Sequence, residues 1–253
     1  MRDSSIALRT PIGYRLHLAG QTGTYCPHGT PQIESASKAL KTRDEWEQAI
    51  AEVDGLGLPR HIDGPKNWDS LIALKWILQS QDKHSHILDA GAESYSVILP
   101  WLFLYGFKRL TGINLTFQRP LRRGWIKYQY GDITRTRFEN GSFGAITCLS
   151  VLEHGVSPSA YFSEASRLLR PGGLLITSVD YYPSSIDTFG KTAYGVPIRV
   201  FSRQDAEAML EMAREYDLYP LDDVDLDCQN KPVKWEEQGL KYTFLIFGLR
   251  KPY

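Results

Sequence analysis

From about residue 86 onward, short apolar runs alternate with segments in which apolar residues recur every three or four positions. The first pattern predicts buried β-strands, and the second predicts helices that bury one face. Repeated strand–helix–strand units imply a parallel sheet covered by helices on both faces and connected right-handedly. The expected strands are 86–91, 109–114, 126–130, 144–149 and 174–179, and the expected helices are 96–105, a short one near 116–123, 158–169 and 203–214.

The end of the chain departs from this alternation. Strand segments near 217–226 and 241–249 follow each other without a helical crossover. Tyr242–Leu249 is rich in residues that favour strands, and the missing crossover indicates that this segment lies antiparallel. We therefore expect an α/β fold with a mostly parallel sheet whose last strand is antiparallel.

The N-terminal part of the chain has a different character. Glycine and proline are frequent in residues 1–33, which predicts an irregular arm. Thr42 and Glu45 then form a capping box, the signature of a helix N-terminus, and Trp46 and Val53 fall on one face of the helix that follows. This helix either packs against the rest of the chain or covers a ligand-binding mouth.

The proline-containing segment 59–65 is the expected joint between this extension and the main domain. We therefore expect an N-terminal helical and irregular extension over residues 1–64 and an α/β domain over residues 65–253. The domain begins with an amphipathic helix from Trp68. A chain of 253 residues can bury a substantial core as one large domain with an elaboration.

The stretch Ile87–Ser96 is the most informative one, because its apolar run stops at Asp89 and Gly91 and an apolar helix follows. Glycine has no Cβ, and backbone N–H groups are available where a helix begins, so a ligand could lie against the main chain here. A single glycine turn is more often a plain connection, so other stretches must support a ligand site. In an open parallel sheet, ligands bind beyond the carboxyl ends of the strands, which here means the loops after Asp89, Asn114, Gly131 and Leu149.

Five stretches along the chain occur in the order that is typical of one family. They are Leu88-Asp89-Ala90-Gly91, Gly112-Ile113-Asn114, Gly131-Asp132-Ile133, residues 143–154 and residues 168–176. With this ordered set, the chain from about Trp68 resembles the class I S-adenosylmethionine-dependent methyltransferases. The resemblance implies a Rossmann-like three-layer sandwich around a seven-stranded sheet, with S-adenosylmethionine as cofactor. Two features depart from the family: Glu93 and Tyr95 stand where further glycines are usual, and Asn114 stands where an acid is usual.

The resemblance also implies which residues bind the cofactor. Asp89 would organise the first loop, Ala90, Gly91 and Ala92 would lie beside the methionine part, Asn114 would meet the ribose hydroxyls, Asp132 and Ile133 the adenine edge, and Leu149 and Ser150 the amino-acid moiety.

Asp132 and Asn114 have a local alternative, because both residue types favour turns at strand ends. If Asn114 does face the ribose, its neutral amide binds hydroxyl groups less strongly than a carboxylate would. From sequence alone we therefore expect Asn114→Asp to tighten cofactor binding by about 1 kcal/mol.

Methyl transfer requires an acceptor held in line at short range, and most of the rate can come from that positioning. Histidine ordinarily has a pKa near neutrality, and His154 follows the fourth strand, where a general base would lie. A capping or packing role for His154 is the alternative. Asp180 is a second candidate base. The aromatic connection 180–202 is too long for a plain turn and predicts a substrate-facing lid, with Tyr181 and Tyr182 nearest the acceptor. The alternative is a loop packed by its own side chains.

The amino-acid composition limits the classes of partner that the chain is expected to bind. Lys plus Arg and Asp plus Glu each number 29, so no long-range field favours nucleic acid or an anionic membrane, and a small-molecule substrate fits better. Cys26, Cys148 and Cys228 lack the spacing of disulfide or metal sites, and no apolar run is long enough to span a membrane. We therefore expect no metal and a cytoplasmic location, and the oligomeric state stays open.

Three functions remain in competition. The leading one is methyl transfer to a small polar metabolite, with a hydroxyl of a sugar or secondary metabolite as acceptor. The second is a methyltransferase-like protein that binds without catalysing, which the departures at Glu93, Tyr95 and Asn114 suggest. The third is a dinucleotide-dependent oxidoreductase, which the missing G-x-G-x-x-G motif disfavours.

Overall fold

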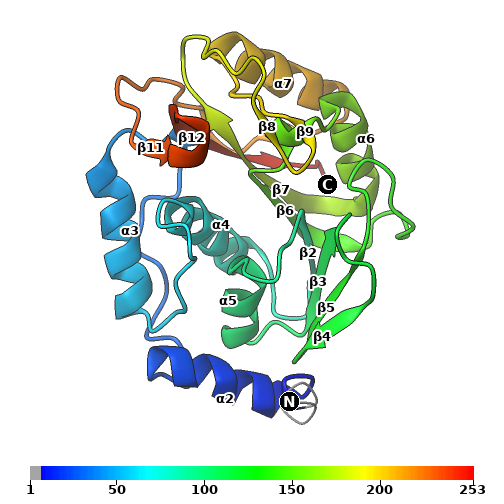
Figure 1. The fold of residues 1–253 in the computed structure, drawn as a ribbon. Coiled ribbons are helices and arrows are strands. Elements are labelled where there is room, and N and C mark those ends of the chain that lie inside the picture. The colour runs from blue at the N-terminus through cyan, green and yellow to red at the C-terminus, as the bar shows by residue number, and fades with distance from the viewer. Residues whose placement is uncertain (1–6) are drawn as a thin grey trace.

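Residues 7–253, which the computed structural model describes, form the expected α/β sandwich (Figure 1). The strands are β1 (Lys38–Ala39), β2 (His86–Ala90), β3 (Arg109–Asn114), β4 (Leu121–Arg123), β5 (Ile126–Tyr130), β6 (Phe143–Leu149), β7 (Leu169–Tyr181), β8 (Thr192–Ala193), β9 (Val196–Pro197), β10 (Tyr219–Pro220), β11 (Val233–Trp235) and β12 (Leu240–Arg250). The main sheet has the order β1-β12-β7-β6-β2-β3-β5-β4, and β10 and β11 also pair with β12.

The pairing within this sheet confirms the expected topology. β2 pairs in parallel with both β3 and β6, and parallel pairing continues outward to β5 and β7. β12 lies antiparallel to β7, as expected for the last strand. Short strands at the edges make the sheet larger than the seven strands that we expected.

Helices cover both faces of the sheet (Figure 1). α3 (Arg43–Gly55), α4 (Lys66–Ser80) and α5 (Ile98–Leu104) lie on one side, and α6 (Pro158–Leu168) and α7 (Arg203–Glu215) lie on the other. Each side has its own apolar cluster. Trp68 and Trp101 are buried in the first cluster, and Tyr161 and Phe162 are buried in the second. Because successive residues of a strand point to opposite faces, the parity of a strand position decides which cluster its side chain enters.

The irregular arm expected over residues 1–33 is wrong for part of that segment, because α2 (Pro11–Thr22) is a helix. Thr10 accepts a hydrogen bond from the N–H of Gly13, and proline is compatible with the first helical turn. Gly23 ends the helix in the left-handed conformation. Residues 1–6 of the expected arm lie outside the described residues.

Packing explains why α2 forms despite its glycines. Tyr14 and Leu18, one helical turn apart, are both buried in the first apolar cluster. Arg15 donates hydrogen bonds to the main-chain carbonyl groups of Phe103 and Leu104 at the end of α5. These contacts come from distant parts of the chain, so local punctuation in the sequence does not reveal them.

The short helix expected near 116–123 is also wrong. Leu121–Arg123 form β4, which pairs antiparallel with β5 across the two-residue turn Gly124-Trp125. Gly124 has φ of 56°, a left-handed conformation that glycine adopts without strain and that matches the twist of a tight hairpin. The strand expected near 217–226 is shorter than predicted, since only Tyr219–Pro220 pair with β12.

The N-terminal extension shares its core with the main domain. Tyr14 and Leu18 of α2 and Ala49 and Val53 of α3 belong to the same apolar cluster as Trp68 of α4. β1 also extends the main sheet by pairing with β12. The division at residues 64 and 65 therefore stays a prediction. No helix among residues 7–253 is long and apolar enough to cross a membrane.

Two helix caps that look alike in sequence differ in the structure. The hydroxyl of Thr42 accepts from the N–H of Glu45, but Glu45 does not return the bond, so only half of the expected capping box forms. Ser202 and Asp205 at the start of α7 form the complete reciprocal pair.

We expect Ser202→Ala to lower the free energy of unfolding by about 1–2 kcal/mol, and Thr42→Ala by less. Urea denaturation of the two variants tests this, and equal losses would contradict it.

Candidate functional site

A buried side-chain hydrogen bond joins the carboxyl ends of the two central strands, β2 and β6. Asp89 of β2 lies in register with Thr147 of β6, whose hydroxyl donates to the Asp89 carboxylate at 2.8 Å. Asp89 is 3% exposed, and burial raises its pKa to about 7. Asp89 therefore fixes the start of the first loop relative to β6, which agrees with the organising role expected of it.

The loop after β2 is folded back onto β3. The N–H groups of Gly91 and Ala92 both donate to the carbonyl oxygen of Ile113, at 2.9 Å and 3.0 Å. Ala90 and Ala92 are buried. The main-chain donors of this turn therefore hold the loop to the neighbouring strand.

Gly91 is required for a steric reason. Its φ is 81°, and a Cβ at this position would lie 2.2 Å from a methyl carbon of Val151, in the loop after β6. The first loop and the loop after β6 thus pack directly against each other. Gly91 makes this contact possible because it has no side chain.

Asn114 meets a carboxylate that the sequence did not connect to it. Its amide nitrogen lies 3.0 Å from Glu93 Oε1, and its amide oxygen accepts from the N–H of Thr116. The Thr116 hydroxyl lies 3.4 Å from the same Glu93 oxygen. Glu93 therefore brings an acid from the loop after β2 to the end of β3, where the family usually has an acid on β3 itself.

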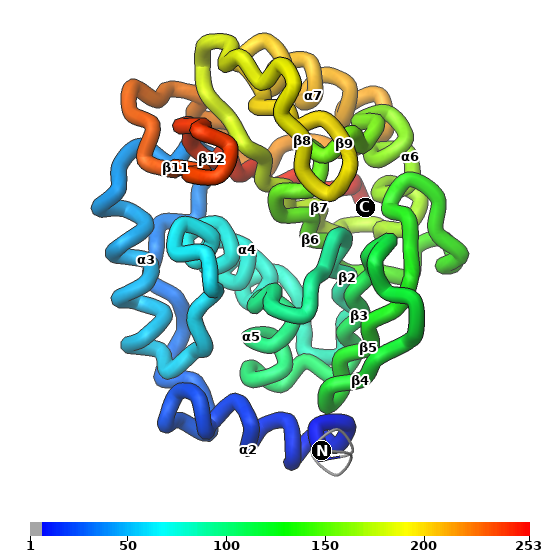
Figure 2. The backbone as a smooth tube through the Cα atoms, in the orientation of Figure 1, coloured from blue at the N-terminus to red at the C-terminus, as the bar shows by residue number. Residues whose placement is uncertain are grey.

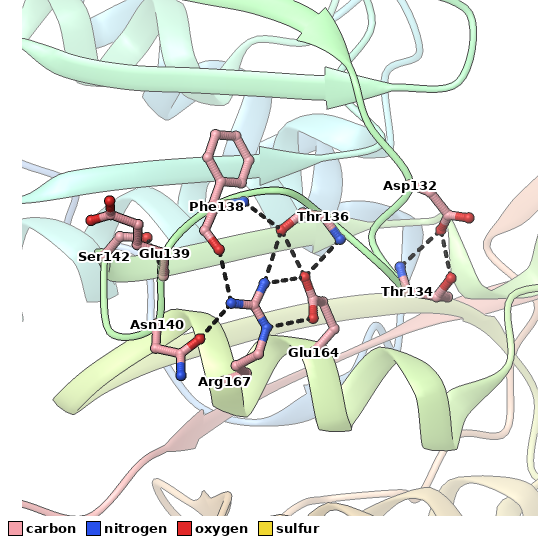
Figure 3. A network of polar contacts seen from close by, with 9 residues as sticks. All are labelled: Asp132, Thr134, Thr136, Phe138, Glu139, Asn140, Ser142, Glu164 and Arg167. Carbon is pink, nitrogen blue, oxygen red and sulfur yellow. Dashed lines mark hydrogen bonds and ion pairs between the residues drawn. The ribbon is translucent and has the colours of Figure 1, made fainter.

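The expected adenine-edge residues have local partners. Asp132 accepts hydrogen bonds from both the N–H and the hydroxyl of Thr134, which is the turn role given above as its alternative (Figure 3). Ile133 is buried in the second apolar cluster. The segment after it is held to α6 through Glu164, which accepts from Thr136 and Arg167. Figure 3 shows this network around the Arg167 guanidinium group.

Leu149 is partly buried against the first cluster, and Ser150 follows it with φ of 53°. The N–H of Ser150 donates to the carbonyl oxygen of Ser178, so the loop after β6 stays tied to β7. The Ser150 hydroxyl contacts the Lys66 ammonium group at the start of α4. Asp69, one turn along α4, lies 2.8 Å from the same ammonium group.

Lys66 is a candidate site residue that the sequence analysis missed. Its side chain is mostly buried, and its ammonium group lies 4.1 Å from the centre of the Phe244 ring. Burial lowers the pKa of Lys66, but Asp69, Glu153 and Asp180 outweigh this and hold it above its ordinary value. Lys66 is therefore a permanent positive charge at the end of β6.

His154 lies in η1 (Leu152–His154), directly after β6. Its Nδ1 is buried and has no hydrogen-bond partner among the described residues, and Tyr194 contacts its ring edge-on, with ring centres 5.1 Å apart. Burial lowers the pKa of His154 below its ordinary value. The imidazole is thus neutral at pH 7 and able to accept a proton.

Asp180 lies near the end of β7, beside Glu153 of η1 and Tyr242 of β12. Burial and the neighbouring Glu153 carboxyl raise its pKa well above the ordinary range. The same two acids, together with burial, raise the pKa of Tyr242. The structure therefore brings the two candidate bases, His154 and Asp180, to the same end of the sheet, where Glu153 and Lys66 are charged neighbours of both.

The two tyrosines expected at the acceptor site have other environments. Tyr181 is fully buried in the second apolar cluster, on the opposite face from Asp180, and its hydroxyl donates to the carbonyl oxygen of Leu226. Strand alternation forces this, because Asp180 and Tyr181 are adjacent in β7. Tyr182 is partly buried, donates to the carbonyl oxygen of Gln229 and stacks under Lys231. We therefore leave Tyr181 out of the proposed acceptor site.

The connection from β7 to α7 forms a structured cover. It contains the β8–β9 hairpin, and Figure 2 shows this hairpin beside α7, at the end of the molecule opposite α2. Tyr194 at the hairpin is 72% exposed and still touches His154. The part of the connection that follows β9 is tied to η1, because the N–H of Arg199 donates to the carbonyl oxygen of Glu153. A lid over the acceptor site stays our interpretation of this segment.

Three candidate site residues escaped the sequence analysis: Glu93, Lys66 and Glu153. One signal for Glu93 was present, since an acid gained in the first loop coincides with an acid missing at Asn114. Lys66 carried no comparable signal, because its partners Ser150 and Phe244 are far away in sequence.

Comparison with known proteins supports this picture. A family model described as a methyltransferase domain matches residues 88–177. Over 40 residues, the chain is 48% identical to the ubiquinone biosynthesis O-methyltransferase of Xanthomonas oryzae pv. oryzae. This match covers 16% of the chain and only 17% of the length of that relative.

Two solved structures share the fold over most of the chain. Geranyl diphosphate C-methyltransferase from Streptomyces coelicolor A3(2), in complex with Mg²⁺, geranyl diphosphate and S-adenosyl-L-homocysteine, is similar with a TM-score of 0.52 and 13% identity, covering 94% of this chain and 98% of that one. The [4+2]-cyclase SpnF is similar with a TM-score of 0.52 and 15% identity, covering 86% of this chain and 99% of that one. At these identities the likeness shows the fold alone.

Residues 88–177 therefore match a methyltransferase-domain family, and the chain has the fold of class I S-adenosylmethionine-dependent methyltransferases. S-adenosylmethionine is the cofactor of such domains. The expected family resemblance, fold and cofactor are therefore confirmed.

The contact of Gly91 with Val151 generates a prediction. We expect Gly91→Ala to lower the free energy of unfolding by more than about 2 kcal/mol, because it adds both a clash and an unfavourable φ. Adding Val151→Ala should recover part of this loss by removing the clashing methyl groups, although the strain in φ remains. Thermal and urea unfolding of the single and double variants test the coupling. Losses that simply add would show that the two loops do not press on each other at this point.

Proposed function

We propose that the chain transfers a methyl group from S-adenosylmethionine to a hydroxyl group of a small polar metabolite, such as a sugar or a secondary metabolite. The observation that carries this proposal is the neutral imidazole of His154 at the end of β6, whose Nδ1 has no hydrogen-bond partner among residues 7–253 and which lies beside the buried acid Glu153. A hydroxyl keeps its proton near neutrality, so a base placed at the acceptor is of use. An O-methyltransferase among the short sequence matches supports the same choice.

The residues at the strand ends suit the proposed cofactor. Glu93 and Asn114 offer a carboxylate and an amide that could share the two ribose hydroxyls. Lys66 and Ser150 offer a cation and a hydroxyl to the amino-acid moiety. Asp89 and Gly91 shape the loop between these two groups. We also propose that Asp132 and Ile133 lie beside the adenine edge of the cofactor, as the family resemblance implies.

S-adenosylmethionine supplies a methyl group bound to a positively charged sulfur. In the proposed reaction a lone pair of the acceptor oxygen forms the new O–CH₃ bond while the bond from that carbon to sulfur breaks, and its electrons stay on sulfur. His154 takes the hydroxyl proton and becomes the imidazolium ion. The nearby Glu153 carboxyl group favours that charged form, because opposite charges in a buried site interact strongly.

A protein that binds the cofactor without transferring methyl groups is the alternative. It is favoured by one observation: the similar structure of a [4+2]-cyclase demonstrates that this fold also serves a different reaction. The dependence of turnover on His154, tested below, separates the two candidates. The proposed location in the cytoplasm, and a small-molecule rather than nucleic-acid partner, rest on the composition alone.

The Glu93–Asn114 pair reverses the expectation from sequence. Asn114→Asp would place two carboxylates at hydrogen-bond distance, so we expect S-adenosylhomocysteine to bind more weakly, not more tightly. Glu93→Gln should also weaken binding, by about tenfold. The combination of both changes returns one acid to the pair and should restore affinity. Calorimetric titration tests this, with exposed Glu139→Gln as the control. Additive losses in the double variant would contradict a shared role.

His154 gives the second test. Once an acceptor is found, we expect His154→Ala to reduce turnover by about 10²-fold or more with little change in S-adenosylhomocysteine affinity. The exposed His84→Ala serves as control. Because burial lowers the pKa of His154, the wild-type rate should be flat at neutral pH and fall only as acid protonates the imidazole. Normal turnover in His154→Ala with the same pH profile would remove this residue from the mechanism.

A further inference from the structure

Tyr194 has a backbone conformation that tyrosine rarely adopts. Ala193 pairs with Val196 across the β8–β9 hairpin, so Tyr194 and Gly195 form its two-residue turn. Both turn residues have positive φ, 53° for Tyr194 and 80° for Gly195. Asn, Asp and Gly favour this kind of turn, whereas a bulky side chain is strained in the left-handed region. Such strain persists where surrounding contacts hold the residue in place, and it is common at functional sites.

The ring of Tyr194 contacts the candidate base. The side chain is 72% exposed, yet its ring meets the His154 imidazole edge-on, with ring centres 5.1 Å apart and ring planes at 84°. Aromatic pairs in this geometry favour one mutual orientation. A residue that served only to turn the hairpin would need no such contact. The strained turn therefore presents an aromatic ring to His154.

His154 depends on packing for its orientation. Its Nδ1 is buried and has no hydrogen-bond partner in the part of the chain that the structure describes. A histidine that acts as a base is ordinarily held in one orientation by a hydrogen bond from a further group to its ring. Where that bond is missing, the groups packed against the imidazole must hold it, and Tyr194 is one of these groups.

Tyr194 is also in contact with the first loop. Burial and the Tyr194 hydroxyl group raise the pKa of Tyr95, so the two tyrosines lie close together although they come from distant parts of the chain. The Tyr95 ring meets His61 edge-on, with ring centres 5.7 Å apart. His61 is fixed in turn, because its N–H donates to the side-chain oxygen of the buried Asn67 at 2.9 Å. A row of aromatic side chains thus runs from His61 to His154.

We propose that Tyr194 is a positioning residue, whose ring holds the His154 imidazole in the orientation and the water-poor surroundings that proton transfer from the acceptor requires. This inference rests on the proposed function, because it takes His154 as the base. It adds a residue of the β8–β9 hairpin that acts through His154, in place of the hydrogen-bonded group that usually orients such a base.

The titration of His154 should depend on this contact. Three groups face the imidazole: Glu153 of η1 favours its charged form, Lys66 of α4 opposes that form, and Tyr194 of the hairpin covers the ring. Burial is the largest influence and lowers the pKa of His154. Removing the Tyr194 ring admits water to the imidazole, so the pKa of His154 should rise toward its ordinary value.

Nuclear magnetic resonance of the His154 imidazole tests this in the free protein, without an acceptor. We expect Tyr194→Asn to raise the pKa of His154, and Tyr194→Phe, which keeps the ring, to leave it near the wild-type value. Phe189→Asn is the matched control, because Phe189 is a 95% exposed aromatic residue of the same connection. An unchanged pKa of His154 in Tyr194→Asn, or the same rise in Phe189→Asn, would overturn the proposal.

Thermal unfolding separates positioning from a role in the fold. Asn is favoured at this turn position, so Tyr194→Asn relieves backbone strain. We therefore expect its melting temperature to equal or exceed that of the wild type. A lower melting temperature would show that the Tyr194 ring serves to stabilise the fold and would count against the proposal.

Turnover gives the third measurement, once an acceptor is found. We expect Tyr194→Asn to reduce kcat by about tenfold with unchanged S-adenosylhomocysteine affinity, and Tyr194→Phe to restore most of the rate. The fall in rate at acid pH should move to higher pH in Tyr194→Asn, because the pKa of its His154 is higher. In a His154→Ala background, Tyr194→Asn should have no further effect. A further loss there would show that Tyr194 does not act through His154.

The possible failures are distinguishable. Normal turnover in Tyr194→Asn, in an enzyme that needs His154, would overturn the positioning role and leave the proposed function standing. Normal turnover in His154→Ala would instead contradict the proposed function. The resonance and melting measurements would still decide whether the Tyr194 ring holds the His154 imidazole.

Discussion

The hydrogen bond from Thr147 to Asp89 crosses the point where the chain reverses the direction in which it builds the sheet. From β2 the chain adds β3 and β5 on one side, and it then returns to add β6 and β7 on the other. The loops after β2 and β6 leave the sheet on opposite sides of this junction, and a crevice at such a point is where ligands of open α/β sheets bind. A buried acid held by a buried hydroxyl keeps the two loops in fixed relation. Every proposed contact to cofactor and acceptor depends on that relation.

The repeating part of the fold was predictable because each strand and helix carries its own periodic pattern. The strands β2, β3, β5, β6 and β7 and the last strand were found from sequence, since a buried parallel strand favours a continuous apolar run. α2 and β4 were not found. α2 is held by Tyr14 and Arg15 against α5, and β4 depends on the two-residue turn at Gly124. Both depend on contacts or turn geometry that a count of glycines and prolines does not capture.

In the candidate site too, local sequence motifs revealed some residues, and long-range contacts were needed to reveal the others. Ordered motifs led to Asp89, Gly91 and His154, because the family pattern assigns these positions a place at the strand ends. The pattern did not reveal Glu93, since it compensates for Asn114 from a different loop and only the folded chain brings the two together. The aromatic content of the connection after β7 also misled about Tyr181, because the alternation of β7 sends this neighbour of Asp180 to the opposite face. Motifs thus locate a site, whereas side-chain direction and long-range pairing decide its members.

The Arg199 contact with Glu153 has a mechanical consequence. The two arms of the connection between β7 and α7 are bonded to each other, through the N–H of Phe201 to the carbonyl oxygen of Asp180 and the N–H of Tyr182 to that of Phe201. Swinging the whole segment away would pull apart the backbone that positions both acids. In our interpretation of this segment as a lid, movement is therefore confined to the stretch that holds the exposed side chains Phe189 and Tyr194, which lies between these bonds along the chain. This interpretation assigns substrate entry and the positioning of the acids to separate parts of one connection, so a change in length or sequence around Tyr194 would leave the backbone of both acids in place.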